Sequence, residues 1–179
     1  NGMVATSNPI ATEVALNILK RSGSAVDAAI AANAILGLME PTGAGIGGDL
    51  FAIVWDAKSS KMHGLNASGK SPKLLTLEKL SSLGLKKMPT DGFIPITVPG
   101  TVDGWFTLHD KFGKLDFNEI LEPSIYFGKN GFYLTEVISS EWDLELNRLG
   151  NFPRFKSTYA PGGFKPKLGA FFKNPMLSN

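Results

Sequence analysis

An alanine-rich stretch constrains the fold more than any other part of this sequence. From Ser24 to Ala34, six of eleven residues are alanine. On a helical wheel these small side chains go almost all the way round, with larger ones such as Ile30 among them, so this helix is expected to be buried on most sides. Ser24 and Asp27 have the spacing of a capping box, and Pro41 should end the helix. We interpret the stretch as a core helix that carries no chemistry itself.

A glycine-rich run follows that helix. Gly43, Gly45 and Gly48 match the pattern G-x-G-x-x-G, but a dinucleotide site needs a strand before the glycines and a helix after them. Here the helix comes first, and the apolar run 50–55, a predicted strand, follows. No Gly-Lys-Ser or Gly-Lys-Thr closes a phosphate loop either. Two interpretations stay open: tight backbone packing at the mouth of a sheet, or a pocket wall built from backbone.

The composition predicts a globular protein and excludes several kinds of site. The 179 residues are 43% hydrophobic and 19% charged, without a compositional break, so we predict a single partial domain over 1–179. The net charge of +2 is scattered, which gives no case for nucleic acid or a membrane surface. The lack of cysteine excludes thiolate chemistry. The two histidines, His63 and His109, lack partners at zinc-site spacings, so no histidine-based zinc site is expected. Neither a metal nor an organic cofactor is implied.

The chain carries no recognisable targeting segment. No apolar run approaches the length of a membrane span, and no charged-then-apolar leader opens the sequence. The chain begins Asn1-Gly2 without methionine, so we expect a processed or trimmed product. The missing leader favours the cytoplasm, with a periplasmic or secreted location as the alternative if a leader was removed.

The remaining pattern predicts more helices than strands. An α+β arrangement is expected, in which two strands form a hairpin that would be marginal alone, so a partner segment should complete the sheet. Asp116 and Glu119 resemble a second capping pair, and Pro123 should break or kink the helix that they open. The tail 151–179 is expected to be an irregular covering segment. Predicted helices cover 9–22, 24–40, 76–83, 101–112, 116–130 and 135–149, and predicted strands cover 50–55 and 61–66.

These segments resemble the gamma-glutamyltranspeptidase family, specifically the N-terminal half of its large subunit. The resemblance runs in order through almost the whole chain. It is carried by 2–5, 18–31, 41–51, Pro72, the motif Thr97-Val-Pro-Gly-Thr-Val-Asp-Gly-Trp105, 112–115, 121–131 and 169–179.

The resemblance implies an N-terminal-nucleophile hydrolase fold, a four-layer αββα sandwich of which this chain contributes only part. Members are made as precursors that cut themselves into two subunits. A threonine at the new N-terminus of the small subunit is the nucleophile, and its own amine can serve as base. The resemblance therefore implies that this chain holds no catalytic residue and that its obligate partner is a small subunit from the same precursor.

The resemblance also places a candidate substrate site after the second predicted strand. Family members that use gamma-glutamyl substrates have an arginine there, which pairs with the substrate α-carboxylate. Counting back from Pro72 puts Ser68 at that position. Lys70 could supply a positive point charge but not the planar fork of an arginine. The candidate substrate-binding residues are Asn66, Ser68 and Lys70, with Ala67 beside them, while 43–49 is expected to shape a neighbouring layer. Asp103 and Trp105 are interpreted as structural.

Three functions are compatible with this pattern. The default of the family is hydrolysis or transfer of an acyl group from gamma-glutamyl amides such as glutathione. The serine in place of arginine leaves room for an acylase that acts on glutaryl-like or other side-chain amides. A noncatalytic scaffold subunit, or a fragment of a longer protein, is the remaining alternative.

Overall fold

The computed structural model describes residues 2–179, which form two compact units. One unit combines the chain up to Gly45 with Leu108–Asn179, and the other comprises Ile46–Thr107. Two units of one chain can belong to one domain, so the expectation of a single partial domain stays a prediction. The content is α+β, as predicted.

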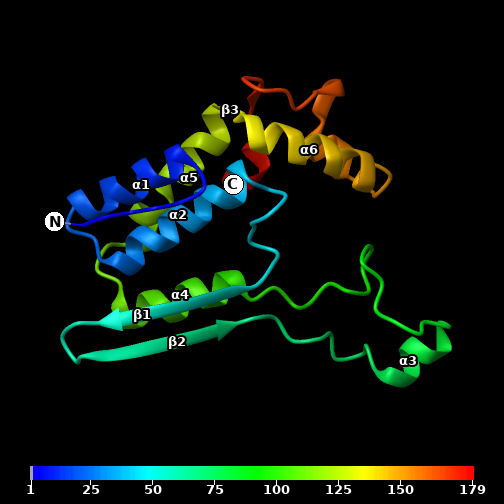
Figure 1. The fold of residues 1–179 in the computed structure, drawn as a ribbon, viewed down its shortest axis with the longest axis horizontal. Helices are drawn as coiled ribbons and strands as arrows, with labels where there is room; N and C mark the ends of the chain where they lie inside the picture. Colours follow the sequence, from blue (N-terminus) through cyan, green and yellow to red (C-terminus); the bar gives the residue numbers. More distant parts are fainter. Residues whose placement is uncertain (1) are drawn as a thin grey trace. The chain divides into compact units, whose positions relative to one another are not determined.

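Three helices form the centre of the first unit: α1 (Pro9–Lys20), α2 (Ala25–Met39) and α5 (Phe117–Asn130). They lie side by side in Figure 1, with α2 in contact with both α1 and α5. The expectation of a thin buried helix is confirmed, since most of α2 is buried, Ile35 completely. Its alanines allow the neighbouring backbones to come close.

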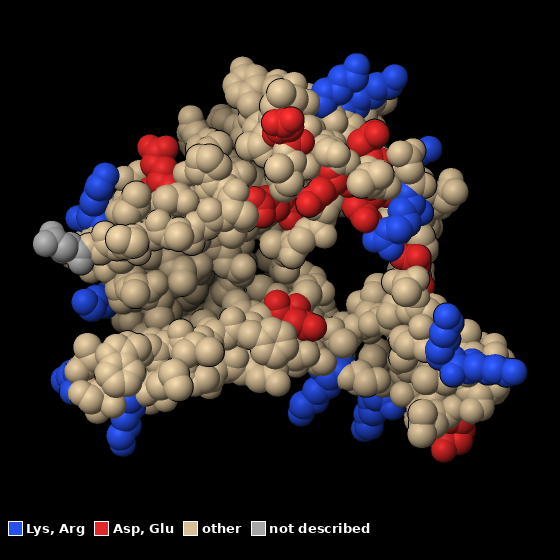
Figure 2. Space-filling view, viewed as in Figure 1, with Lys and Arg blue, Asp and Glu red and all other residues tan. Residues whose placement is uncertain are grey.

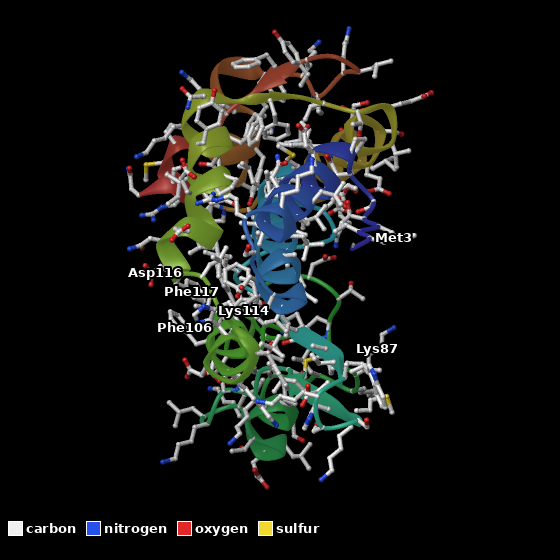
Figure 3. All side chains as sticks on the ribbon, turned by 90° about the vertical axis from the view of Figure 1, so that its left-hand side faces the viewer. Met3, Lys87, Phe106, Lys114, Asp116 and Phe117 are labelled. Carbon is white, nitrogen blue, oxygen red and sulfur yellow. The ribbon has the colours of Figure 1, made fainter. Side chains whose placement is uncertain are left out.

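The start of α2 is tied to the connection between α4 (Thr101–Phe112) and α5 through Asp27. The predicted capping box is present: the Ser24 hydroxyl accepts from the Asp27 amide, and the Asp27 carboxylate accepts from the Ser24 amide. The same carboxylate is fully buried and also accepts from the backbone N–H groups of Lys114 and Leu115, at 3.1 and 3.3 Å. His109 lies beside it, with its Nε2 2.7 Å from the Leu115 carbonyl oxygen. Figure 3 marks this connection by Lys114 and Asp116.

The second predicted capping pair is only partly correct. Asp116 is the N-cap of α5, but its side chain makes no capping hydrogen bond. Glu119 instead forms an ion pair with Arg21 of the first unit, at 2.6 Å. The helix continues through Pro123, which therefore does not end it, and Gly131 follows the last turn with a φ of 91°.

An aromatic cluster closes the first unit around Trp142 of α6 (Glu136–Leu149). The indole N–H donates to the Tyr159 carbonyl oxygen, and the ring packs edge-on against Phe172, with a centroid distance of 4.7 Å. The tail is more regular than expected. It contains α7 (Phe155–Tyr159), the 3-10 helices Pro161–Gly163 and Pro175–Ser178, and β4 (Phe171–Phe172), which pairs with β3 (Phe132–Tyr133).

The second unit is built on the predicted hairpin of β1 (Leu50–Asp56) and β2 (Lys61–Ala67). The antiparallel register pairs Leu50 with Ala67 and Asp56 with Lys61. A short helix, α3 (Leu77–Ser82), is capped by the Thr76 hydroxyl, and the first turns of α4 end the unit. No described helix, in either unit, is long and apolar enough to cross a membrane.

One face of the hairpin is apolar and exposed. Residues at alternate positions of β1 point to the same side, and their cross-strand neighbours on β2 extend that surface. Figure 2 shows the surface over the hairpin mostly without charge, and its charged strand and turn residues lie at the turn. The large exposed side chains of this face are Phe51, Ile53, Trp55 and Met62, between 63% and 78% exposed.

Removing the Asp27 carboxylate should destabilise the protein strongly. Asp27→Ala leaves the amides of Ser24, Lys114 and Leu115 without their acceptor in a buried site, which should cost at least about 3 kcal/mol of the free energy of unfolding. Asp103→Asn, at an exposed position in the first turn of α4, is the control and should stay within about 1 kcal/mol. Urea unfolding of both variants measures the difference, and equal losses would contradict the assigned role of Asp27.

Candidate functional site

The candidate site lies in the second unit, where the chain leaves β2. The segment 66–70 runs there between two other segments of the same unit: the pair Gly48-Asp49, just before β1, and the extended stretch 97–101, which leads into α4. The candidate site was predicted only on 66–70, and 43–49 was expected to shape a neighbouring layer.

Asp49 joins these three segments through one carboxylate oxygen. Its Oδ1 accepts a hydrogen bond from the Gly69 backbone N–H at 2.9 Å and another from the Thr97 hydroxyl at 3.2 Å. The Val98 N–H in turn donates to the Lys70 carbonyl oxygen at 2.9 Å. The Ser68–Gly69 peptide, one residue before Lys70, and the Lys70–Ser71 peptide, directly after it, therefore each make one hydrogen bond.

The carbonyl group of Gly48 anchors the start of α4. It accepts hydrogen bonds from the N–H groups of Gly100 and Thr101, at 3.0 and 3.1 Å. These are donors that the first turn of a helix cannot satisfy internally. The extended approach to α4 agrees with the prolines at 95 and 99, because the residue before a proline is kept out of the helical region.

Three glycines allow this close approach. A Cβ at Gly69 would overlap the Val98 carbonyl oxygen, and one at Gly100 would overlap the Ala67 carbonyl oxygen. A Cβ at Gly104, in the first turn of α4, would lie only 2.7 Å from the Ala67 side chain. No flexible side chain end could give way at Gly69 or Gly100, since the obstacle is backbone.

The structure brings together the predicted residues of 66–70 but gives them different surroundings. Asn66 is exposed, and its side-chain oxygen accepts from the Ser68 N–H at 2.9 Å, so this oxygen shapes the turn. Ala67 is half-buried against Gly104, away from the exposed face on which Asn66 lies. Ser68 and Lys70 are exposed, and Lys70 forms no ion pair with any residue of 2–179.

Sequence reasoning missed Asp49 as part of this site. The predictions for the run 43–49 depend on its glycines, and they assign no role to the carboxylate at its end. One signal could have identified it: Asp49 is the only charged residue between Glu40 and Asp56. A single carboxylate in an otherwise uncharged, glycine-rich stretch is a candidate for a specific contact, and here it accepts hydrogen bonds from Gly69 and Thr97.

The other predicted features agree with structural roles. Trp105 is 4% exposed, and Asp103 is exposed in the first turn of α4. A Cβ at Gly43, Gly45 or Gly47 would meet no atom of the described chain within 4 Å. The Gly45 backbone does lie close to α2, since its Cα would be 3.2 Å from a Cβ at Gly37, so both interpretations of the glycine run stay predictions.

The chemistry that this arrangement offers is binding. An exposed ammonium on a fixed stretch of backbone can hold an anion such as a carboxylate. The described residues contain no group of three or more histidine, aspartate or glutamate side chains that could hold a metal ion. Asp49 is a poor candidate for a general base, because its Oδ1 is already occupied by hydrogen bonds from Gly69 and Thr97.

Comparison with known proteins identifies relatives along the whole chain. The family model described as gamma-glutamyltranspeptidase matches residues 11–179. A glutathione hydrolase proenzyme of Bacillus subtilis is 30% identical over 177 residues, which cover 94% of this chain and 29% of that protein. The chain thus spans less than a third of the length of this curated relative.

Solved structures of similar proteins have the same arrangement of the chain. A cephalosporin acylase from Bacillus halodurans superposes with a TM-score of 0.91 and is 38% identical, with 98% of this chain and 34% of that chain covered. The gamma-glutamyltranspeptidase of Helicobacter pylori also gives a TM-score of 0.91, at 25% identity, with 99% of this chain and 52% of that chain covered.

A side chain at position 69 should disrupt the site. Gly69→Ala forces the turn away from Val98 and should cost about 1 to 3 kcal/mol of stability, as overpacking does. Gly64→Ala is the matched control on β2, because a Cβ there meets nothing within 4 Å. Thermal unfolding should show a lower midpoint for Gly69→Ala only. Two indistinguishable variants would show that the close approach at Gly69 does not contribute to stability.

Proposed function

Because this chain belongs to the gamma-glutamyltranspeptidase family, we propose that it is the first part of an amidohydrolase or acyltransferase that cleaves gamma-glutamyl amides such as glutathione. The family match over 11–179 carries this proposal. The nucleophile is a threonine at the N-terminus of a separate small subunit from the same precursor. In this proposal the described chain contributes the scaffold and one side of the acyl-donor site.

The exposed hairpin face supports a partner from the same precursor. Four large apolar side chains on one side of a two-stranded sheet form a surface that an isolated hairpin could not keep stable in water. In the proposed four-layer sandwich, a second sheet covers this face. The relatives have the necessary additional chain, since this chain covers only about a third of the cephalosporin acylase.

Lys70 is the proposed ligand for the carboxylate of the acyl donor. It follows β2, near the position at which family members carry their carboxylate-binding arginine, and it is exposed on backbone that is hydrogen-bonded at the Gly69 N–H and at the Lys70 carbonyl group. Ser68 and the free amide of Asn66 can add hydrogen bonds but no charge. Compared with an arginine, the ammonium of Lys70 cannot bind a carboxylate through two parallel hydrogen bonds, but it still attracts the negative charge.

An acylase for glutaryl-like amides is the second candidate function. The observation that favours it is the 38% identity to the cephalosporin acylase, against 25% for the Helicobacter gamma-glutamyltranspeptidase. Gamma-glutamyl and glutaryl groups both end in a carboxylate and differ in the α-amino group. Lys70 could bind either, so the choice between them depends on groups that recognise the amine.

Self-cleavage of the full-length gene product tests the proposed function. Intact mass and N-terminal sequencing should show two fragments, the second beginning with threonine. The same sample should release 4-nitroaniline from gamma-glutamyl or glutaryl 4-nitroanilide, and the preferred anilide separates the two candidate functions. An uncut chain without turnover would favour the scaffold alternative instead.

Neutralising Lys70 should weaken donor binding. Lys70→Met in the full-length protein loses a charged interaction of about 1.5 to 3 kcal/mol, so KM for the preferred anilide should rise about 10-fold to 100-fold. Lys70→Arg should keep a low KM, and Lys73→Met, which removes a nearby exposed lysine, is the control. Initial-rate kinetics measures all three. An unchanged KM for Lys70→Met would exclude Lys70 as the carboxylate ligand.

A further inference from the structure

We infer that Asp49 is a positioning residue that sets donor specificity by holding the backbone from which Lys70 projects. This inference rests on the proposed function and adds a residue to it. The observation that carries it is the pair of hydrogen bonds that Asp49 Oδ1 accepts from Gly69 and Thr97.

The Asp49 side chain accepts a backbone hydrogen bond just beyond the point where pairing between the strands ends. The last pair of the hairpin joins Leu50 to Ala67, so one more step of the register would put Asp49 opposite Ser68. The chain turns there instead, and the Gly69 N–H finds a side-chain oxygen in place of a main-chain carbonyl.

The bond from Gly69 to Asp49 is one of two hydrogen bonds that hold the backbone near Lys70. On one side, Gly69 donates to Asp49, and on the other, the Lys70 carbonyl group accepts from Val98 at 2.9 Å. Thr97, the residue before Val98, donates to the same Asp49 oxygen. These three hydrogen bonds link Asp49, the turn at 69–70 and the segment 97–98. Losing the Asp49 carboxylate therefore removes the bonds that it accepts from both the turn and the segment.

The consequence is a specific effect on charged donors. A long lysine side chain on mobile backbone loses conformational entropy when it binds a carboxylate. A backbone that is already held in place reduces this entropy loss. In this inference Asp49 acts as a hydrogen-bond acceptor and not through its charge. The amide oxygen of asparagine at position 49 could accept the same two hydrogen bonds. A direct effect of the Asp49 charge on donor binding would behave differently, since asparagine removes it.

The test compares Asp49→Ala and Asp49→Asn in the full-length protein. Asp56→Ala is the matched control, because Asp56 also accepts backbone and hydroxyl hydrogen bonds on this hairpin, but at the turn end. Asp49→Ala should raise KM for the preferred carboxylate-bearing anilide about tenfold while kcat changes less than about twofold. KM for butyryl 4-nitroanilide, which lacks the carboxylate, should not change. Asp49→Asn and Asp56→Ala should match the wild type.

Several results would overturn the inference. Equal KM changes for the charged and uncharged anilides would indicate a general structural role, and an Asp49→Asn variant that behaves like Asp49→Ala would make the charge responsible. A fully wild-type Asp49→Ala variant would exclude any role. Calorimetric titration with glutarate needs no turnover and should show the same weakening for Asp49→Ala alone.

The same experiments separate this inference from the proposed function. A wild type that is cut and active, with Asp49→Ala equal to Asp56→Ala, overturns only the role of Asp49. A wild type that is uncut and inactive overturns the proposed activity, while glutarate titration still decides whether Asp49 supports anion binding. A wild type that neither reacts nor binds glutarate overturns both.

Discussion

The close approach of two backbone segments is the constraint on which the candidate site depends. The chain after β2 lies against the extended stretch before α4, and glycine at 69, 100 and 104 leaves no side chain between them. Hydrogen bonds to Gly48 and Asp49 then hold the segments together. Any side chain at Gly69 or Gly100 would collide with a carbonyl oxygen, so the local geometry leaves little choice of residue.

The second constraint is the apolar outer face of the hairpin. The side chains on its inner face are only half-buried, and the large apolar side chains on its outer face are exposed. Neither face of the hairpin is therefore fully removed from water within the described unit. A covering sheet from the same precursor would bury the outer face and at the same time bring the nucleophile toward the end of β2. Under the proposed function, one surface thus serves both stability and the assembly of the site.

The parts of the fold that were predictable from sequence are those fixed by local rules. The Ser24 and Asp27 capping box, the two-strand hairpin and the helix ends at Gly113 and Gly131 depend on neighbouring residues, and all were predicted. The failures involve distant partners. The Glu119 side chain pairs with Arg21, nearly a hundred residues away, so it does not complete a cap on α5.

The same distinction applies to the candidate site. The position of Lys70 and Ser68 after β2 was predicted by counting back from Pro72. The hydrogen bonds of Asp49 to Gly69 and Thr97 join residues 20 and 48 positions apart, which no local pattern encodes. The β3 and β4 pair was missed because each strand has only two residues, too few for a period-two pattern.

The most direct test of the donor site is a crystal structure of the full-length protein with an unreactive glutaryl or gamma-glutamyl donor analogue. We expect the carboxylate of the analogue to lie within hydrogen-bond distance of Lys70 Nζ, with the Gly69 N–H still bound to Asp49. A carboxylate held elsewhere, with Lys70 extended into solvent, would contradict the assignment of the segment after β2 as the donor site.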